Sequence, residues 1–204
     1  MKKRKTNRIR VVVVDHFDSF TYNMVRRLRL LGAKVCVVRT DASVADVVKF
    51  RPTHIVLSAG EGNPKDVTLF HEVLEYFKAL VPIFGICLGH QVIGLYFGAK
   101  IARCGKIMHG KTSVVYHENR GVFSGIKNGL QAMRYHSLVI VNGSIPPKVL
   151  RQIARTADGA VMAVECVEYP HIVGVQFHPE SWFTECGAEM FVNFLTTKVK
   201  NQFF

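Results

Sequence analysis

The chain has 204 residues, of which 49% are hydrophobic and 21% are charged, a composition that is typical of one globular domain and excludes collagen-like, coiled-coil and disordered classes. Its 27 basic and 15 acidic residues give a formal net charge of +12. Its five cysteines include no CxxC pair, so they fit neither a disulfide framework nor a zinc site.

Basic residues are concentrated at the N-terminus, where residues 1–10 read MKKRKTNRIR. We expect residues 1–8 to form a flexible, solvated tail ahead of one domain at residues 9–204. A basic tail also allows nucleic-acid binding, but no RNA-binding aromatic signature, helix-turn-helix pattern or zinc knuckle accompanies it. No apolar run of signal-peptide length follows the tail, and we therefore expect a cytoplasmic protein.

Strand and helix patterns alternate through the first half of the chain. A β-branched run at residues 11–14 is typical of a strand buried on both faces, and apolar residues at helical spacing follow from Phe20 to Leu31. Further strands are predicted at residues 34–38, 54–57 and 81–86, and further helices at residues 43–50, 67–77 and 88–97. This alternation predicts parallel strands with ligands at their carboxyl ends.

The stretch at residues 79–99 is the one that is apolar enough to suggest a membrane span. A spanning helix needs about 20 predominantly apolar residues, whereas Pro82, three glycines and a His-Gln pair divide this stretch. We therefore interpret it as a buried strand followed by a helix, and we expect no membrane association.

After Gly98 the pattern changes to short strands separated by turns. Strands are predicted at residues 112–116, 132–135, 149–154, 161–167 and 172–176, and a helix at residues 188–199 closes the chain. We expect these strands to be antiparallel additions to the same sheet. The predicted fold class is therefore α/β: a single domain with a central, mostly parallel sheet flanked by helices, plus antiparallel strands in the second half.

The heptapeptide GICLGHQ at residues 85–91 places a cysteine where an apolar strand turns directly into a helix. Gly85 and Gly89 lie two residues to either side of Cys87 and let the backbone pack closely enough to project its side chain from a strained turn. The helix offers unpaired N–H groups that lower a thiol pKa and hold an oxyanion. Free cysteines are often simply buried, but the glycine frame favours a nucleophile at Cys87.

A cysteine nucleophile needs a base, and that base needs an orienting partner. The segment VGVQFHPES at residues 173–181 ends an apolar strand and supplies His178 and Glu180 with a proline between them. The Glu180 carboxylate is close enough in sequence to hold the imidazole tautomer, as in a catalytic triad. Spacing alone leaves an equal alternative, which is a solvated His-Glu pair at a strand end.

Three further segments accompany these two: DHFDSFTYN at residues 15–23, HGKTS at residues 109–113 and YHSL at residues 135–138. The segments at residues 85–91 and 174–181, with Cys, His and Glu in that order along the chain, resemble the class I (triad-type) glutamine amidotransferases. More specifically, the three further segments resemble the small subunits, or component II, of anthranilate synthase and 4-amino-4-deoxychorismate synthase. The likeness extends from about residue 9 to residue 195.

The resemblance implies a role for each matching position. Cys87 would be the nucleophile, His178 the general base and acid, and Glu180 the carboxylate that orients the imidazole. Seven further residues would bind the substrate glutamine or its oxyanion: Gly60, Glu61, Gly62, Leu88, Gln91, Ser137 and Leu138. The N–H groups of Gly60 and Leu88 would form the oxyanion hole. His136 and the stretch at residues 109–113 would be scaffold or partner contacts, and no metal site is implied.

The implied reaction is hydrolysis of L-glutamine through a cysteine thioester. The ammonia would be delivered to a larger, chorismate-binding synthase subunit that makes anthranilate or 4-amino-4-deoxychorismate, in a hetero-oligomer. Because the amidotransferase unit uses nearly all of the chain, the acceptor site must lie on that partner. No cofactor is expected on this chain, and magnesium is expected on the partner subunit.

Two segments depart from the family pattern. The loop that is usually Pro-Gly-Pro-Gly reads AGEG at residues 59–62, so two stiffening prolines are missing and Glu61 brings a carboxylate near the developing negative charge. We therefore expect a looser or switchable oxyanion loop, unless Glu61 points to solvent or to a basic partner. The first motif also has His-Phe at residues 16–17, where Asn-Tyr is common.

Three alternatives remain open at this stage. Amidotransferases that serve nucleotide, histidine or carbamoyl phosphate synthesis share the Cys-His-Glu set but lack the motif at residues 15–23. A nucleic-acid-binding protein on an inactive amidotransferase scaffold would use the basic tail. A cysteine hydrolase of another small amide would share the nucleophile and its base.

Overall fold

Buried valines near the N-terminus form an inner strand of a sheet, one strand from its edge, in the computed structural model, which describes residues 9–199. Strand β1 (Arg10–His16) buries all four side chains of residues 11–14 completely. Because successive side chains of a strand point to opposite faces, Val11 and Val13 join one apolar cluster, and the other two valines join a second. The basic tail predicted at residues 1–8 lies outside the described residues.

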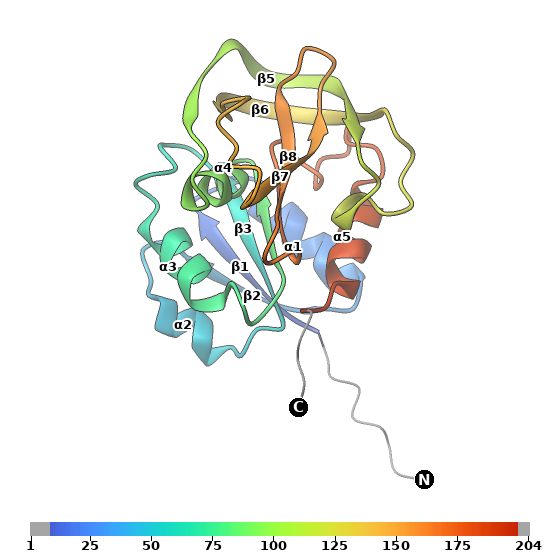
Figure 1. Cartoon of the computed structure of the whole chain (residues 1–204). Coiled ribbons are helices and arrows are strands. Elements are labelled where there is room, and N and C mark those ends of the chain that lie inside the picture. Colours follow the sequence, from blue (N-terminus) through green and yellow to red (C-terminus); the bar gives the residue numbers. More distant parts are fainter. Residues whose placement is uncertain (1–8, 200–204) are drawn as a thin grey trace.

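The described part of the chain contributes nine strands to one sheet (Figure 1). Besides β1 they are β2 (Lys34–Arg39), β3 (His54–Gly60), β4 (Ile83–Ile86), β5 (Ile101–His117), β6 (Leu130–Ile140), β7 (Leu150–Arg155), β8 (Val161–Cys166) and β9 (Ile172–Val175). Their order across the sheet is β2-β1-β3-β4-β9-β8-β7-β5-β6. Pairing is parallel from β2 to β9 and antiparallel from β9 to β6.

Helices cover both faces of the parallel part of the sheet, as its full burial requires. They are α1 (Thr21–Leu30), α2 (Val44–Lys49), α3 (Thr68–Phe77), α4 (Leu88–Tyr96) and α5 (Gly187–Thr196), with a 3₁₀ turn, η1 (Gly121–Phe123). Apolar residues of α1 and α5, such as Leu28 and Phe191, belong to one cluster. Those of α2, α3 and α4, such as Phe70 and Val92, belong to the other.

The predicted α/β class is confirmed, and the first-half strands and helices lie within a few residues of their predicted positions. The apolar stretch at residues 79–99 holds β4 and α4, as expected. Within residues 9–199, every helix is too short or too polar to cross a membrane.

One prediction for the second half was wrong, because β9 is not purely antiparallel. It pairs antiparallel with β8 on one edge and parallel with β4 on the other, with Ile86 of β4 opposite Val175. The edge of β4 carries backbone N–H and C=O groups that must be paired when buried, and β9 satisfies them. This strand therefore joins the two halves of the chain.

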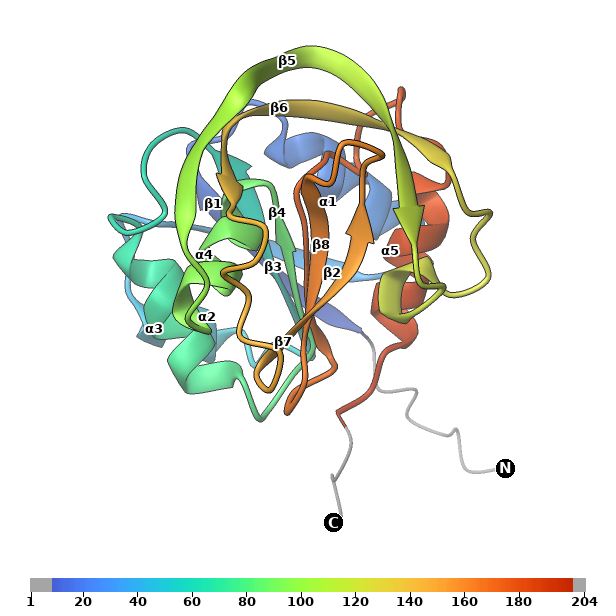
Figure 2. The same ribbon diagram turned by 45° about the horizontal axis from the view of Figure 1, so that its top comes forward.

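Strands β5 and β6 are longer than predicted and form an arch above the parallel strands (Figure 2). Two glycines within β5, Gly105 and Gly110, coincide with irregularities in the β5–β6 register, between Arg103 and Met108 and between His109 and Lys111. Gly110 adopts φ 63°, a left-handed conformation that glycine tolerates without strain.

The close packing expected of the glycines around Cys87 is confirmed. A Cβ atom at Gly85 would lie 2.6 Å from backbone atoms of Gly89, and one at Gly89 would lie 2.4 Å from the Leu57 carbonyl oxygen. No side chain fits at either position unless β3, β4 or α4 moves. These two glycines therefore hold the start of α4 directly against the sheet.

We expect Gly89→Ala to destabilise the fold by about 1–3 kcal/mol, because the added methyl group overpacks a site closed by backbone atoms. The matched control is Gly105→Ala, since a Cβ there meets nothing within 4 Å. Thermal or urea unfolding midpoints of the two variants would measure the difference. Equal midpoints would contradict the proposed role of the close contact.

Candidate active site

Cys87 lies in the sharp turn between β4 and α4. Its backbone has φ 51° and ψ −95°, a strained conformation for a residue with a side chain, and it is the N-cap of α4. Its N–H donates to the Val175 carbonyl oxygen of β9 at 2.8 Å. The predicted strained turn is therefore present, and the sulfur lies at the N-terminal end of a helix, where the helix dipole favours negative charge.

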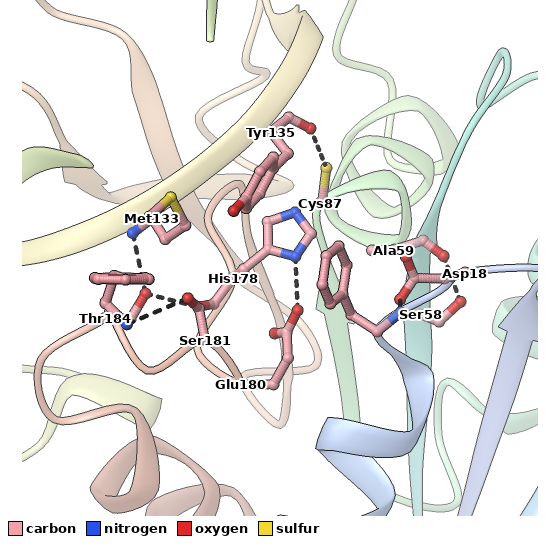
Figure 3. Close-up of polar contacts among 12 residues, drawn as sticks. Asp18, Ser58, Ala59, Cys87, Met133, Tyr135, His178, Glu180, Ser181 and Thr184 are labelled. Atoms are coloured by element: carbon pink, nitrogen blue, oxygen red, sulfur yellow. Dashed lines mark hydrogen bonds and ion pairs between the residues drawn. The ribbon is translucent and has the colours of Figure 1, made fainter. Parts of the chain in front are cut away.

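His178 and Glu180 lie just beyond the end of β9, next to the strand that carries Cys87. The His178 Nδ1 atom donates to Glu180 Oε1 at 2.6 Å, and both side chains are buried. The imidazole stands between the carboxylate and Cys87, with its second nitrogen toward the cysteine (Figure 3). Sequence spacing left two interpretations open, a catalytic His-Glu pair and a solvated pair at a strand end. Because both side chains are buried, the solvated pair is excluded.

Opposing effects act on the pKa of His178. Burial lowers the pKa, but the charge of Glu180 and the neighbouring Cys87 outweigh it and raise the pKa well above its ordinary value of 6.5. A raised pKa favours the imidazolium form, which stabilises a thiolate at Cys87. The three side chains can therefore act as nucleophile, base and orienting carboxylate.

Backbone contacts fix the segment that carries His178 and Glu180. The Arg27 guanidinium of α1 donates to the Glu180 carbonyl oxygen at 3.0 Å, and the Thr184 hydroxyl donates to the His178 carbonyl oxygen at 2.6 Å. Thr184 in turn accepts from the Met133 N–H of β6 at 3.0 Å (Figure 3). The segment is thus held by α1 on one side and by the arch strand on the other.

A cleft of about 600 Å³ opens in front of Cys87 and His178. Most of the predicted substrate-binding residues line it: Gly60, Glu61, Gly62, Gln91, Ser137 and Leu138. Two predicted site residues, Leu88 and Glu180, do not line the cleft. Glu180 is buried behind His178, and the Leu88 side chain packs in the core beneath α4, which leaves only the Leu88 N–H for an oxyanion.

The loop at residues 59–62 packs against the other unusual position, His16. The site of a Cβ atom on Gly60 lies 2.6 Å from the His16 carbonyl oxygen and 3.0 Å from its ring. The His16 ring is hydrogen-bonded through Nδ1 to Thr40 Oγ1 at 2.8 Å, and the His16 backbone N–H donates to Ser58 Oγ at 3.0 Å. Glu61 is exposed and also lines the mouth of the cleft. The looser oxyanion loop expected from the sequence stays a prediction.

His136 and His109 also line the cleft. Both ring nitrogens of His136 are engaged, since Nδ1 donates to the Leu138 carbonyl oxygen at 3.1 Å and Nε2 accepts from Arg134 at 2.9 Å. Burial and the Arg134 charge lower the pKa of His136 to about 4. A neutral, fully bonded imidazole fits the expected scaffold role of His136.

Sequence reasoning assigned no role to two residues of the cleft, Asp18 and Tyr135. Burial and the Glu180 charge raise the pKa of Asp18 to about 6, and no sequence signal distinguishes this carboxylate from a solvated one. The Tyr135 ring meets His178 edge-on with centroids 5.3 Å apart, and its carbonyl oxygen accepts from Cys87 Sγ at 3.7 Å (Figure 3). Both residues do belong to motifs noted in the sequence.

Residues 9–199 hold no group of three or more His, Cys, Asp or Glu side chains that could bind a metal ion. None of the five cysteines, all of which lie in the described part of the chain, is in a disulfide. The Cys166 thiol is buried in the core, and burial raises its pKa. Of the two buried cysteines, Cys87 is the one that lines the cleft, together with His178.

A family model described as glutamine amidotransferase class-I matches residues 12–198. The chain is 40% identical to anthranilate synthase component 2 of Cyanophora paradoxa, over 91% of this chain and 97% of that protein. It is 39% identical to aminodeoxychorismate/anthranilate synthase component 2 of Bacillus subtilis, over 92% and 96% respectively. It is 46% identical to the bifunctional protein TrpGD of Thermotoga maritima, of which it spans only 32%.

Solved structures share the fold. A Thermoplasma acidophilum protein described as a GMP synthase subunit superposes with a TM-score of 0.81, at 28% identity over 92% of each chain. A glutamine amidotransferase from Thermotoga maritima superposes with a TM-score of 0.65, at 17% identity over 84% of this chain and 76% of that one. The second likeness concerns the fold alone.

The buried His178–Glu180 pair predicts a pH-dependent contribution to stability. Because the pKa of His178 is raised on folding, the imidazolium stabilises the folded chain below about pH 6.5, and this contribution is lost as the pH rises through the folded-state pKa. We expect Glu180→Gln to lower stability by about 1–3 kcal/mol at acidic pH, with the difference shrinking at alkaline pH. Urea unfolding across pH measures it, and a gap independent of pH would contradict the assignment.

The loop at residues 59–62 generates a second prediction. We expect Ala59→Pro with Glu61→Pro to raise the rate of glutamine hydrolysis, because a stiffer loop without the carboxylate holds the oxyanion donors in place. Steady-state assays of the double variant would test this, with the unfolding midpoint as a check on folding. An unchanged rate would dispose of the idea that the loop is looser.

Proposed function

This chain belongs to the class-I glutamine amidotransferase family, and we propose that it is the glutaminase subunit of a chorismate-using synthase. In this role it hydrolyses L-glutamine and delivers ammonia to a larger partner chain. The observation that carries the proposal is the placement of Cys87 beside the buried His178–Glu180 pair at one end of the cleft. The near-complete coverage of component 2 relatives supports it.

The first half of the reaction forms a thioester. The Cys87 thiolate attacks the side-chain amide carbon of glutamine, and the negative charge moves to the carbonyl oxygen, which the N–H groups of Gly60 and Leu88 stabilise. Each such donor is worth on the order of 3 kcal/mol in the transition state. The imidazolium of His178 then gives its proton to the leaving nitrogen, the C–N bond breaks, and ammonia departs.

The second half releases glutamate. A water molecule gives a proton to neutral His178 and attacks the thioester carbon, the C–S bond breaks, and the thiolate returns. Glu180 orients the imidazole through both halves by accepting from Nδ1. Gln91, Gly62, Ser137 and Leu138 hold the amino acid in the cleft, and Glu61 lies at its rim. No cofactor on this chain takes part in these steps.

Ammonia must leave the cleft without meeting bulk water, where at neutral pH it becomes ammonium and loses its nucleophilic lone pair. Large exposed apolar side chains gather at the mouth of the cleft, namely Phe17, Phe20 and Ile107. Exposed apolar groups of this kind mark surfaces that partner proteins cover. We assign this face to the chorismate-binding subunit, on which magnesium would be bound.

The partner has an acidic docking face in this proposal. Arginines accompany the exposed aromatic side chains, with Arg39 stacked over Phe17 at 4.1 Å and Arg27 over Trp182 at 5.6 Å. Opposite charges on the two faces would speed association at low ionic strength. An association that is independent of salt would count against the acidic face. Two of the three relatives named above carry component 2 names, which supports anthranilate, 4-amino-4-deoxychorismate or both as the product of the complete synthase.

A glutaminase assay with and without candidate chorismate-binding subunits tests this function. We expect glutamate release by the wild-type chain, and its loss to background in Cys87→Ser, because the hydroxyl is a far weaker nucleophile than the thiolate. The matched control is Cys36→Ser, a change at a half-buried cysteine of β2 that lies outside the cleft. No glutamate above the Cys87→Ser background in any pairing would defeat the proposal.

A further inference from the structure

Gln176 lies directly after β9, and the mechanism above does not use it. Its side chain is fully buried, and its backbone N–H donates to the Met162 carbonyl oxygen at 2.9 Å, which fixes where the side chain begins. Its Nε2 atom donates to Cys87 Sγ at 3.7 Å. A buried amide that touches the sulfur has a direct means of acting on its charge.

The neighbouring side chain of Gln91 determines which end of the Gln176 amide, the oxygen or the NH₂ group, faces the sulfur. The Leu138 carbonyl oxygen can only accept, and Gln91 Nε2 donates to it at 2.9 Å. The same Nε2 atom donates to Gln176 Oε1 at 3.2 Å. With its oxygen committed to Gln91, Gln176 must present its NH₂ group to the sulfur, because the reversed amide would place two donors together.

Two more hydrogen bonds connect Gln91 and Gln176 to the arch formed by β5 and β6. Arg134 has no acceptor atom, so its Nε–H donates to His136 Nε2 at 2.9 Å, and this leaves the His136 proton on Nδ1. Nδ1 then donates to the Leu138 carbonyl oxygen at 3.1 Å, which also accepts from Gln91. The same arch therefore orients both Gln91 and, through it, Gln176.

We propose that Gln176 is a further catalytic residue, which stabilises the Cys87 thiolate by donating an N–H hydrogen bond to Sγ. This inference rests on the proposed function. When Cys87 is protonated, Sγ–H donates to the Tyr135 carbonyl oxygen, an interaction that favours the protonated form and ends when the proton leaves. The bond from Gln176 instead strengthens as the sulfur becomes negative. It assists attack on glutamine and the departure of the thiolate from the thioester.

The test measures the pH dependence of Cys87 alkylation by iodoacetamide, followed by mass spectrometry of the Cys87 peptide. Gln176→Met keeps the length of the side chain but removes the donor. We expect its thiolate titration to shift to higher pH, with a roughly tenfold lower alkylation rate near pH 7. The matched control, Gln131→Met on the exposed side of β6, should titrate like the wild type.

A second variant guards against a folding defect. If Gln176→Met has a lowered unfolding midpoint, Gln176→Asn is used in its place. The shorter side chain keeps a buried amide but withdraws its N–H from the sulfur, so we expect the same shift of the thiolate titration to higher pH. With a partner subunit present, the folded variant should change kcat more than KM for glutamine, because the donor acts on the sulfur directly and on the substrate only through Gln91.

A wild-type alkylation profile in either folded variant would overturn the role of Gln176. This result is distinguishable from failure of the proposed function. If the wild-type chain releases no glutamate with any partner, the glutaminase assignment falls, whereas the alkylation profiles still decide whether Gln176 stabilises the thiolate.

Discussion

Parallel pairing of β4 with β9 is the constraint on which the site depends. It places Ile86 opposite Val175 and allows the Cys87 N–H to donate to the Val175 carbonyl oxygen at 2.8 Å. Two segments distant in sequence thereby leave the sheet side by side, with the nucleophile on one and its base on the other. A shift of one residue in this register would turn the side chains of β9 to opposite faces and separate the sulfur from the imidazole.

The site carries local costs that the rest of the fold must offset. Cys87 adopts a positive φ, and within the described chain Glu180 Oε2 is buried without a hydrogen-bond partner. Strained residues and unpaired polar groups each cost about 1–3 kcal/mol. Two apolar clusters, one on each face of the sheet, supply the compensating burial. The strained elements persist because neighbouring strands and helices leave the backbone no alternative.

The arch formed by β5 and β6 completes a cleft that the parallel strands could not form alone. Tyr135 and Leu138 of β6 face the ends of the parallel strands, and the Leu138 carbonyl oxygen connects the arch to Gln91 of α4. His16 and the loop at residues 59–62, the two departures from the family pattern, meet on the opposite side. The arch reaches the sulfur through the Tyr135 carbonyl oxygen, and His16 and the loop line the same cleft. A partner covering the mouth of the cleft would lie against both sides.

The sequence by itself determined the features that depend on local chemistry. The valine run of β1, the helical spacings and the glycine frame of Cys87 were predictable, because side-chain period and close backbone contact act within a few residues. Motif order identified the family. Tertiary structure alone decided the parallel direction of β9, the burial of the His178–Glu180 pair, the raised pKa of Asp18 and the contact of Gln176 with sulfur. Strand pairing and burial depend on neighbours distant in sequence, and no local pattern encodes them.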